Sequence, residues 1–286
     1  MNELGTAQAV ESRRDGETAT VCVVGLGYVG LPLAVAFDQA GHTVRGYDIS
    51  PSTIEQLQQG EDPTGDVGDP AVDESDIGFD TDSAVIEGAD VVVVTVPTPI
   101  SDENDPNLDF VEAASKTVGE HLSPGGTVVL ESTVFPGATR EVVVPAIEEA
   151  SGFRLGEEFT VGYSPERLVP GDDAHSLENV VKIVSASDDE TLAELVQLYE
   201  SIVDVGVHEA PSLAVAEAAK CIENVQRDVN IALINELSVA CDRLGIDSNA
   251  VLEAAGTKWN FHDYRPGLVG GHCIPVDPFF FIYQSK

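Results

Sequence analysis

Positive charge is scarce in this sequence. Lysine and arginine account for only 14 of the 286 residues, against 50 aspartates and glutamates, and the formal net charge at pH 7 is -36. A surface of this charge repels the phosphates of nucleic acids and the head groups of anionic membranes, so we expect neither as a partner. The acidic residues are spread along the chain, which favours a halophilic protein adapted to a salt-rich cytoplasm.

Cysteine and long hydrophobic runs are also rare. The four cysteines are Cys22, Cys221, Cys241 and Cys273, and their spacing forms neither a CxxC pair nor a metal-binding pattern. We expect the first three to be core or helix-face residues. No apolar run approaches the length of a transmembrane helix, and the N-terminus lacks the pattern of a signal peptide. The sequence therefore predicts a soluble, reduced, cytoplasmic protein without a metal ion.

Apolar runs alternate with helical segments in the first two thirds of the chain. Residues 1–18 lack periodicity and are expected to form a mobile acidic leader, and the acid-rich stretch 60–80 is expected to be a surface excursion. This alternation is typical of an α/β fold with a doubly wound, Rossmann-type, mostly parallel sheet. The strands are predicted at 21–24, 43–47, 91–96, 127–130, 159–163, 180–184 and 202–207.

The pattern becomes helical after Pro211. Residues 212–244 contain neither proline nor glycine, Gly245 ends this long helix, and a shorter helix is predicted at 248–255. We therefore place a Rossmann-type domain at 19–208 and an all-helical central domain at 209–286.

A glycine-rich turn follows the first predicted strand. Gly25, Gly27 and Gly30 form a GxGxxG motif that opens a helix, and Asp48 ends the second strand. Glycines let a pyrophosphate approach the helix N-terminus, whose free N–H groups attract it. Asp48 would accept hydrogen bonds from the ribose hydroxyls and repel a 2′-phosphate, which favours NAD over NADP. A tight turn with an incidental aspartate is the alternative.

Five motifs extend this pattern along the chain. They are GLGYVGLP, VPTP, ESTVFPG, SPERLVPG and GGHCIPVDP, with Lys220 and Asn224 between the last two. Together they resemble the UDP-glucose/GDP-mannose dehydrogenase family from about Val21 to Pro278. The last two motifs are most similar to the branch that oxidises UDP-N-acetyl-glucosamine, -galactosamine or -mannosamine, and Val276 replaces a lysine of the glucose branch.

The resemblance implies the residues that contact NAD and the sugar. NAD contacts are expected from Gly25, Gly27, Tyr28, Val29, Gly30, Asp48, Pro97, Thr98, Ser132 and Thr133. Substrate contacts are expected from Glu166, Arg167, Lys220, Asn224, Gly267, Gly270 and Gly271. An ion pair between Arg167 and Glu166 would instead make both structural.

Such enzymes oxidise the C6 alcohol of the sugar to a carboxylate in two NAD-dependent steps. Holding the intermediate aldehyde requires a nucleophile, and a thiolate can form a thiohemiacetal and then a thioester that water hydrolyses. The resemblance assigns this role to Cys273, although a buried thiol in a proline-rich turn is the alternative.

Five other residues share the catalytic role that the resemblance implies. Lys220 and Asn224 lie four apart on one face of the long helix and would stabilise charge on the C6 oxygen. Glu166 would act as the base for thioester hydrolysis, Thr133 would lie near the nicotinamide, and Asp277 would partner Lys220. In the alternatives without a catalytic role, Lys220 is a solvated lysine on the helix surface and Thr133 caps a helix.

Members of this family are longer than this sequence, which stops eight residues after Pro278. We expect the C-terminal UDP-binding domain to be absent and the truncated chain to be weakly active or inactive. The leading hypothesis is an NAD-dependent UDP-N-acetylhexosamine 6-dehydrogenase that serves polysaccharide or glycan synthesis, as a homodimer through helix 212–244. The alternatives are a UDP-glucose 6-dehydrogenase, a single-step 3-hydroxyacid dehydrogenase and a non-catalytic NAD-binding dimerisation module. Cys273 separates the first from the single-step enzyme, because one oxidation needs no thiol.

Overall fold

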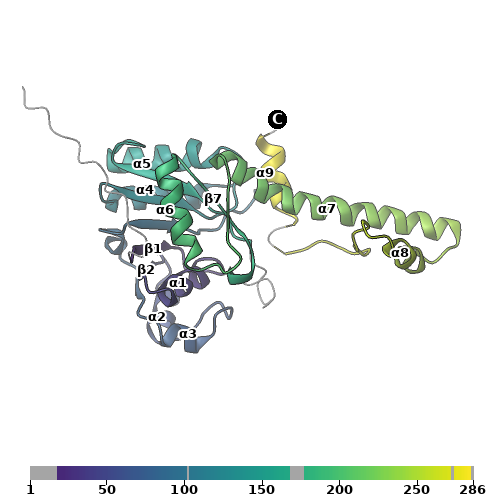
Figure 1. Cartoon of the computed structure of the whole chain (residues 1–286), viewed down its shortest axis with the longest axis horizontal. Helices are drawn as coiled ribbons and strands as arrows, with labels where there is room; N and C mark the ends of the chain where they lie inside the picture. Colours follow the sequence, from purple (N-terminus) through teal and green to yellow (C-terminus); the bar gives the residue numbers. More distant parts are fainter. Residues whose placement is uncertain (1–17, 102, 168–176, 272–273, 285–286) are drawn as a thin grey trace, which may run out of the picture.

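The fold is built on one eight-stranded sheet. A computed structural model describes residues 18–101, 103–167, 177–271 and 274–284, and Figure 1 shows their arrangement. The strand order is β3-β2-β1-β4-β5-β6-β7-β8, and neighbours from β3 to β6 are parallel. The strands are β1 (Thr20–Val24), β2 (Thr43–Tyr47), β3 (Gly78–Asp80), β4 (Val91–Val94), β5 (Gly126–Leu130), β6 (Phe159–Tyr163), β7 (Lys182–Ala186) and β8 (Val207–Glu209).

Successive strand residues face two separate apolar cores. Cys22 and Val24 of β1 belong to one core, whereas Val21 and Val23 belong to the other. The first core is covered by α4 (Asp109–His121), α5 (Val144–Ser151), the start of α7 (Leu213–Leu244) and α9 (Asp277–Gln284). The second is covered by α1 (Gly30–Gln39), α2 (Pro51–Gln58), α3 (Asp69–Asp73) and α6 (Asp189–Glu200). Burial of both faces confirms the predicted doubly wound α/β fold.

The sheet contains one reversal of strand direction. β7 pairs antiparallel with β6, with Tyr163 opposite Ser185, and β8 pairs parallel with β7. The strand predicted at 202–207 is wrong in its position, because β8 begins at Val207. Ile202 and Val203 are buried in the turn that follows α6. An apolar run indicates burial and cannot by itself distinguish a strand from a buried turn.

The acid-rich stretch 60–80 is part of the fold. It contains α3 and the edge strand β3, which pairs with β2, so the prediction of a surface excursion was incomplete. Asp62 organises its first turn by accepting hydrogen bonds from the backbone N–H groups of Thr64, Val67 and Gly68. Asp62 therefore stabilises the conformation of this stretch in addition to adding negative charge.

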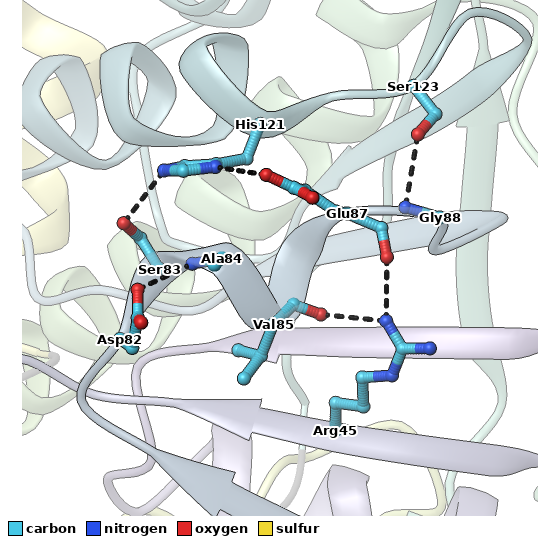
Figure 2. A network of polar contacts seen from close by, with 9 residues as sticks. All are labelled: Arg45, Asp82, Ser83, Ala84, Val85, Glu87, Gly88, His121 and Ser123. Atoms are coloured by element: carbon cyan, nitrogen blue, oxygen red, sulfur yellow. Dashed lines mark hydrogen bonds and ion pairs between the residues drawn. The ribbon is translucent and has the colours of Figure 1, made fainter.

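A short helical turn, η1 (Ser83–Ile86), returns the chain from β3 to β4 and is held from two sides (Figure 2). From β2, Arg45 Nη1 donates to the carbonyl oxygens of Val85 at 3.0 Å and Glu87 at 2.7 Å. From the end of α4, His121 contacts the Ser83 hydroxyl at 2.9 Å and the Glu87 carboxylate at 3.2 Å. The network fixes the loop between the edge strand and the centre of the sheet.

The long helix α7 matches the sequence prediction closely. Ser212 caps its N-terminus by accepting a hydrogen bond from Val215 N, and Gly245 ends it with a φ of 70°. The helix starts against the sheet and then runs away from it, with α8 (Ser248–Gly256) beside its far half (Figure 1). Several large apolar side chains of the far half are exposed: Val229, Leu233, Leu237, Val239 and Leu244.

Candidate active site

The glycine turn lies between β1 and the N-terminus of α1, at the carboxyl ends of the central strands. Gly25 has a φ of 92° and donates its N–H to Tyr47 O of β2 at 2.8 Å. Thr95, directly after β4, donates its hydroxyl to Gly25 O at 2.7 Å. The turn is therefore fixed by both neighbouring strands of β1.

The other two glycines of the motif are needed for different reasons. A Cβ atom on Gly30 would overlap Gly25 O, so this glycine lets the helix approach the strand. A Cβ atom on Gly27 would have nothing within 4 Å. The backbone at Gly27 is exposed, so a pyrophosphate has room to approach the start of α1. These features fit a dinucleotide such as NAD.

Asp48, directly after β2, points its carboxylate toward the glycine turn. It accepts hydrogen bonds from Leu26 N at 2.8 Å and from Ser50 N at 2.8 Å. The carboxylate is half-buried and lies beside the turn, where a bound ribose would meet it. Tyr28 is exposed and Val29 is the N-cap residue of α1, so both border the same opening.

The remaining predicted cofactor residues follow β4 and β5. Pro97 is exposed and Thr98 is half-buried in the segment after β4. Ser132, after β5, donates its hydroxyl to Val96 O at 2.6 Å and so ties the two segments together. Thr133, beside it, is half-buried. Adjacent parallel strands thus bring these four residues to one edge of the sheet.

The start of α7 brings Lys220 and Asn224 to Asp277, the first residue of α9. Asn224 Nδ2 donates to Asp277 Oδ2 at 2.5 Å. Burial raises the pKa of Asp277, and the hydrogen bond from Asn224 and the positive charge of Lys220 oppose this rise. Three predicted catalytic residues therefore share one partly desolvated polar cluster.

Glu166 lies after β6 and is buried. Its Oε1 accepts a hydrogen bond from Arg167 N at 2.6 Å, and its Oε2 lies 3.2 Å from Lys182 Nζ. The guanidinium of Arg167 instead pairs with Glu223 of α7, with 2.8 Å between Nη2 and Oε1. Among the described residues, the cation seen to pair with the Glu166 carboxylate is thus Lys182.

Glu217, on the buried face of α7, joins the helix to the loop that follows Thr133. Its carboxylate accepts hydrogen bonds from Gly137 N at 2.5 Å, Thr139 N at 2.9 Å and Thr139 Oγ1 at 2.6 Å. Lys220 lies one helical turn further along α7. Glu217 therefore fixes the lysine relative to the loop that carries Thr133.

Glu217→Gln is expected to lower the free energy of unfolding by about 1–3 kcal/mol, because an amide turns its NH₂ group toward at least one of three buried donors. Urea unfolding measures this change. The matched control is Glu236→Gln, an exposed position on the same helix, which should change the value by less than about 0.5 kcal/mol. Equal effects of the two substitutions would contradict the linking role of Glu217.

Gly267, one of the predicted substrate residues, lies against a part of α7 beyond Asn224. Gly267 exchanges two hydrogen bonds with Asn235 of α7, at 2.9 Å and 2.8 Å. Asn235 lies eleven residues beyond Asn224, which corresponds to roughly 16 Å along a helix. Gly270 and Gly271 are exposed in the following segment. Cys273 lies outside the described residues.

The other cysteines are buried, as predicted. Burial raises the pKa of Cys22 and of Cys221 to about 12, so both thiols stay protonated and unreactive near neutral pH. Within the described part of the chain, no cluster of histidine, cysteine, aspartate and glutamate could hold a metal ion. In the same part, no helix has both the length and the apolar composition needed to cross a bilayer.

Sequence reasoning missed three buried residues behind the site: Glu131, Lys182 and Glu217. A signal was present for two of them. Lys182 lies in the apolar run VVKIV of a chain with only 14 basic residues, and Glu131 opens the ESTVFPG motif. A charged residue next to or inside an apolar strand predicts a buried partner of opposite charge.

Two family models match the chain. Residues 19–203 match the NAD binding domain of the UDP-glucose/GDP-mannose dehydrogenase family, and residues 214–286 match the central domain of the same family. The first match alone covers more than half of the chain.

Curated relatives and solved structures agree with these matches. The chain is 51% identical over 268 residues to UDP-N-acetyl-D-glucosamine 6-dehydrogenase from Pseudomonas aeruginosa, covering 93% of this chain and 63% of that protein. It is 49% identical over 266 residues to Protein CapL from Staphylococcus aureus, covering 93% and 62%. A UDP-D-ManNAc dehydrogenase from Pyrococcus horikoshii has a TM-score of 0.88 at 32% identity, covering 93% and 65%. The chain thus spans less than two thirds of the length of these three proteins.

Proposed function

Because the chain belongs to the UDP-glucose/GDP-mannose dehydrogenase family, we propose that it oxidises the C6 hydroxyl of a UDP-N-acetylhexosamine to a carboxylate with NAD. The observation that carries the proposal is the cluster of Lys220, Asn224 and Asp277 where α7 meets α9. The names of the relatives from P. aeruginosa and P. horikoshii support the substrate class.

NAD would be held by the glycine turn and Asp48. The start of α1 and the open backbone at Gly27 suit the pyrophosphate, and the half-buried Asp48 carboxylate suits the ribose. Pro97, Thr98, Ser132 and Thr133 would border the nicotinamide end. When bound, NAD supplies the hydride acceptor for each oxidation.

In the first oxidation the C6 hydroxyl would lose its proton to water as its carbon loses a hydride. Lys220 would stabilise the developing charge on the oxygen, and Asn224 would donate a hydrogen bond to it. Asp277 accepts from Asn224 and so holds the amide in one orientation. The product of this step is an aldehyde.

The second oxidation needs a covalent intermediate. The Cys273 thiolate would add to the aldehyde carbon, forming a C–S bond and a thiohemiacetal whose hydride can then leave to give a thioester. Glu166 would take a proton from water as the water oxygen adds to the thioester carbon. The C–S bond then breaks, which regenerates the Cys273 thiolate, and the sugar carboxylic acid loses its remaining proton to water to give the carboxylate.

Two further features belong to the same proposal. The exposed apolar side chains on the far half of α7 suit a homodimer formed through helix 212–244. The net charge of -36 suits a salt-rich cytoplasm. Arg167, Gly267, Gly270 and Gly271 are proposed to border the sugar nucleotide.

The purified chain, mixed with NAD and UDP-N-acetylglucosamine in high salt, is expected to turn over slowly and to form two NADH for each sugar oxidised. Cys273→Ala should reduce this to at most one NADH and abolish the acid product, because no thioester can form. Absorbance at the NADH band and chromatography of the sugar nucleotides measure both quantities.

The matched control is Cys241→Ala, which removes a buried thiol from the far half of α7 and should keep two NADH per sugar. One NADH per sugar in the unmodified chain, unaffected by Cys273→Ala, would favour a single-step hydroxyacid dehydrogenase. Preferential oxidation of UDP-glucose over UDP-N-acetylglucosamine would indicate that the chain is a UDP-glucose 6-dehydrogenase. NAD binding with no oxidation of any UDP-sugar would favour a non-catalytic module.

A further inference from the structure

Four buried side chains, one of them Glu166, form a polar cluster next to the proposed active site. This cluster consists of Glu131 after β5, Glu166 after β6, Lys182 at the start of β7 and Tyr199 on α6. The antiparallel pairing of β7 with β6 explains why Lys182 lies next to Glu166. The antiparallel register that sets Tyr163 opposite Ser185 brings the start of β7 toward the residues that follow β6, and Lys182 there contacts Glu166. A parallel β7 would begin at the other edge of the sheet.

The cluster holds one cation between two carboxylates. Lys182 Nζ lies 2.6 Å from Glu131 Oε2 and 3.2 Å from Glu166 Oε2, and the lysine side chain is 2% exposed. Tyr199 donates its hydroxyl to the other oxygen of Glu131 at 2.5 Å. The shorter contact of Lys182 is thus with Glu131, the carboxylate that lies deeper.

We propose that Glu131 and Lys182 are positioning residues for Glu166, and that the charge on Glu131 decides how firmly Lys182 holds the Glu166 carboxylate. The inference rests on the proposed function, in which Glu166 takes a proton from the hydrolytic water. A charged Glu131 draws the ammonium toward itself and leaves Glu166 freer to accept that proton. When Glu131 is neutral, the Lys182 ammonium pairs mainly with the Glu166 carboxylate and makes it a weaker base.

The charge on Glu131 changes within the physiological pH range. Burial raises the pKa of Glu131 to about 7, with the charge of Lys182 lowering it and that of Glu166 raising it. The hydrogen bond from Tyr199 also lowers it. Among the described residues, the ionisable groups that face Glu131 are Lys182, Glu166, Tyr199 and Tyr163. Burial keeps both tyrosines protonated, because it raises the pKa of each well above its usual value.

This arrangement makes hydrolysis of the proposed thioester depend on pH through a residue that does not touch the substrate. Below about pH 7 the lysine would be left to Glu166, and above it the two carboxylates would share the lysine. The rate of acid formation should therefore rise through this range as Glu131 loses its proton.

Glu131→Gln tests the proposal, because the amide imitates the neutral carboxyl at every pH and keeps nearly the same shape. Acid formation by the full chain is expected to match the unmodified chain within about twofold near pH 6 and to be about tenfold slower near pH 8. A purely structural effect would slow the reaction equally at both pH values and would overturn the proposal.

A second measurement does not depend on turnover. In chain labelled with ¹³C at the glutamate carboxyls, the Glu131 resonance, assigned through its loss in Glu131→Gln, should titrate near pH 7. Glu166→Gln should lower this pKa, because it removes the carboxylate that raises it. An unchanged Glu131 titration in Glu166→Gln would overturn the coupling.

The two experiments separate failure of this inference from failure of the proposed function. If no UDP-sugar is oxidised but Glu166→Gln shifts the Glu131 titration, the proposed function fails and the coupling stands. If acid forms and Glu131→Gln keeps the full pH dependence, the proposed function stands and the positioning role fails.

Discussion

Gly30→Ala is expected to prevent the glycine turn from closing and to lower the free energy of unfolding by more than about 4 kcal/mol. The new Cβ atom would overlap Gly25 O and lie 2.5 Å from Thr95 Oγ1. Gly25 O belongs to the backbone, and Thr95 Oγ1 is held by its hydrogen bonds to Val24 O and Gly25 O. Gly25 O accepts from Thr95, and Gly25 N bonds to β2, so the turn cannot shift without breaking the centre of the sheet.

Gly27→Ala is the matched control, because the same substitution three positions earlier in the turn meets nothing within 4 Å. We expect its free energy of unfolding to stay within about 0.5 kcal/mol of the unmodified chain. Its affinity for NAD should still fall on the order of tenfold or more, because the methyl group fills the approach of the pyrophosphate.

Urea unfolding and fluorescence titration with NAD separate the two substitutions. Gly30→Ala should lower both the free energy of unfolding and the affinity for NAD. Gly27→Ala should lower only the affinity for NAD. Wild-type stability of Gly30→Ala would show that the helix can move away from β1. Unchanged NAD affinity of Gly27→Ala would place the pyrophosphate elsewhere.

Lys182→Met is expected to lower the free energy of unfolding near pH 8 by about 3–5 kcal/mol, because it leaves two buried carboxylates without their cation. Methionine keeps much of the length of the lysine stem, so packing changes little. Both carboxylates and the lysine are almost completely buried, and solvent cannot replace the lost charge.

The sign of the pH dependence follows from Glu131. Its folded-state pKa of about 7 lies above the ordinary value of 4.5. Its contribution to stability is therefore complete below about pH 4.5 and is lost as the pH rises through 7. Removing Lys182 takes away the charge that lowers this pKa and raises it further. The loss caused by Lys182→Met should therefore shrink from pH 8 toward pH 5, where the carboxylates take up protons.

Urea unfolding at several pH values measures this dependence. Lys116→Met, at a lysine that forms a surface ion pair with Glu112, should leave stability nearly unchanged at each pH. A loss in Lys182→Met that does not vary with pH would show that the lysine acts through packing alone. Lys182→Arg should recover part of the lost stability, because it restores the charge.

Local patterns predicted those parts of the fold that depend on neighbours in sequence. Ser212 and Gly245 mark the ends of α7, because a capping hydroxyl and a left-handed glycine act within one turn of the residues they terminate. The glycine motif and Asp48 predicted a turn and a carboxylate that the structure brings together.

Features that depend on distant neighbours were not predictable in this way. The edge strand β3 is three residues long and acquires its identity from pairing with β2. The direction of β7 is set by its pairing with β6, and no residue within β7 encodes it. Glu131 and Lys182 are 51 residues apart, so their ion pair could be proposed only after that direction was known.

The way α7 starts bears on how this protein could exchange parts with its relatives by recombination. Leu213, Ala216 and Cys221 lie in the same core as the strands, and Cys221 Sγ donates to Val134 O at 3.3 Å. A crossover just before α7 would combine two halves of one core that had not been selected together. A crossover beyond Cys221 would keep the first turns of α7 with the strands, although Phe280 of α9, which lies in the same core, would come from the other parent. The segments best inherited together are therefore the sheet, the first turns of α7 and α9.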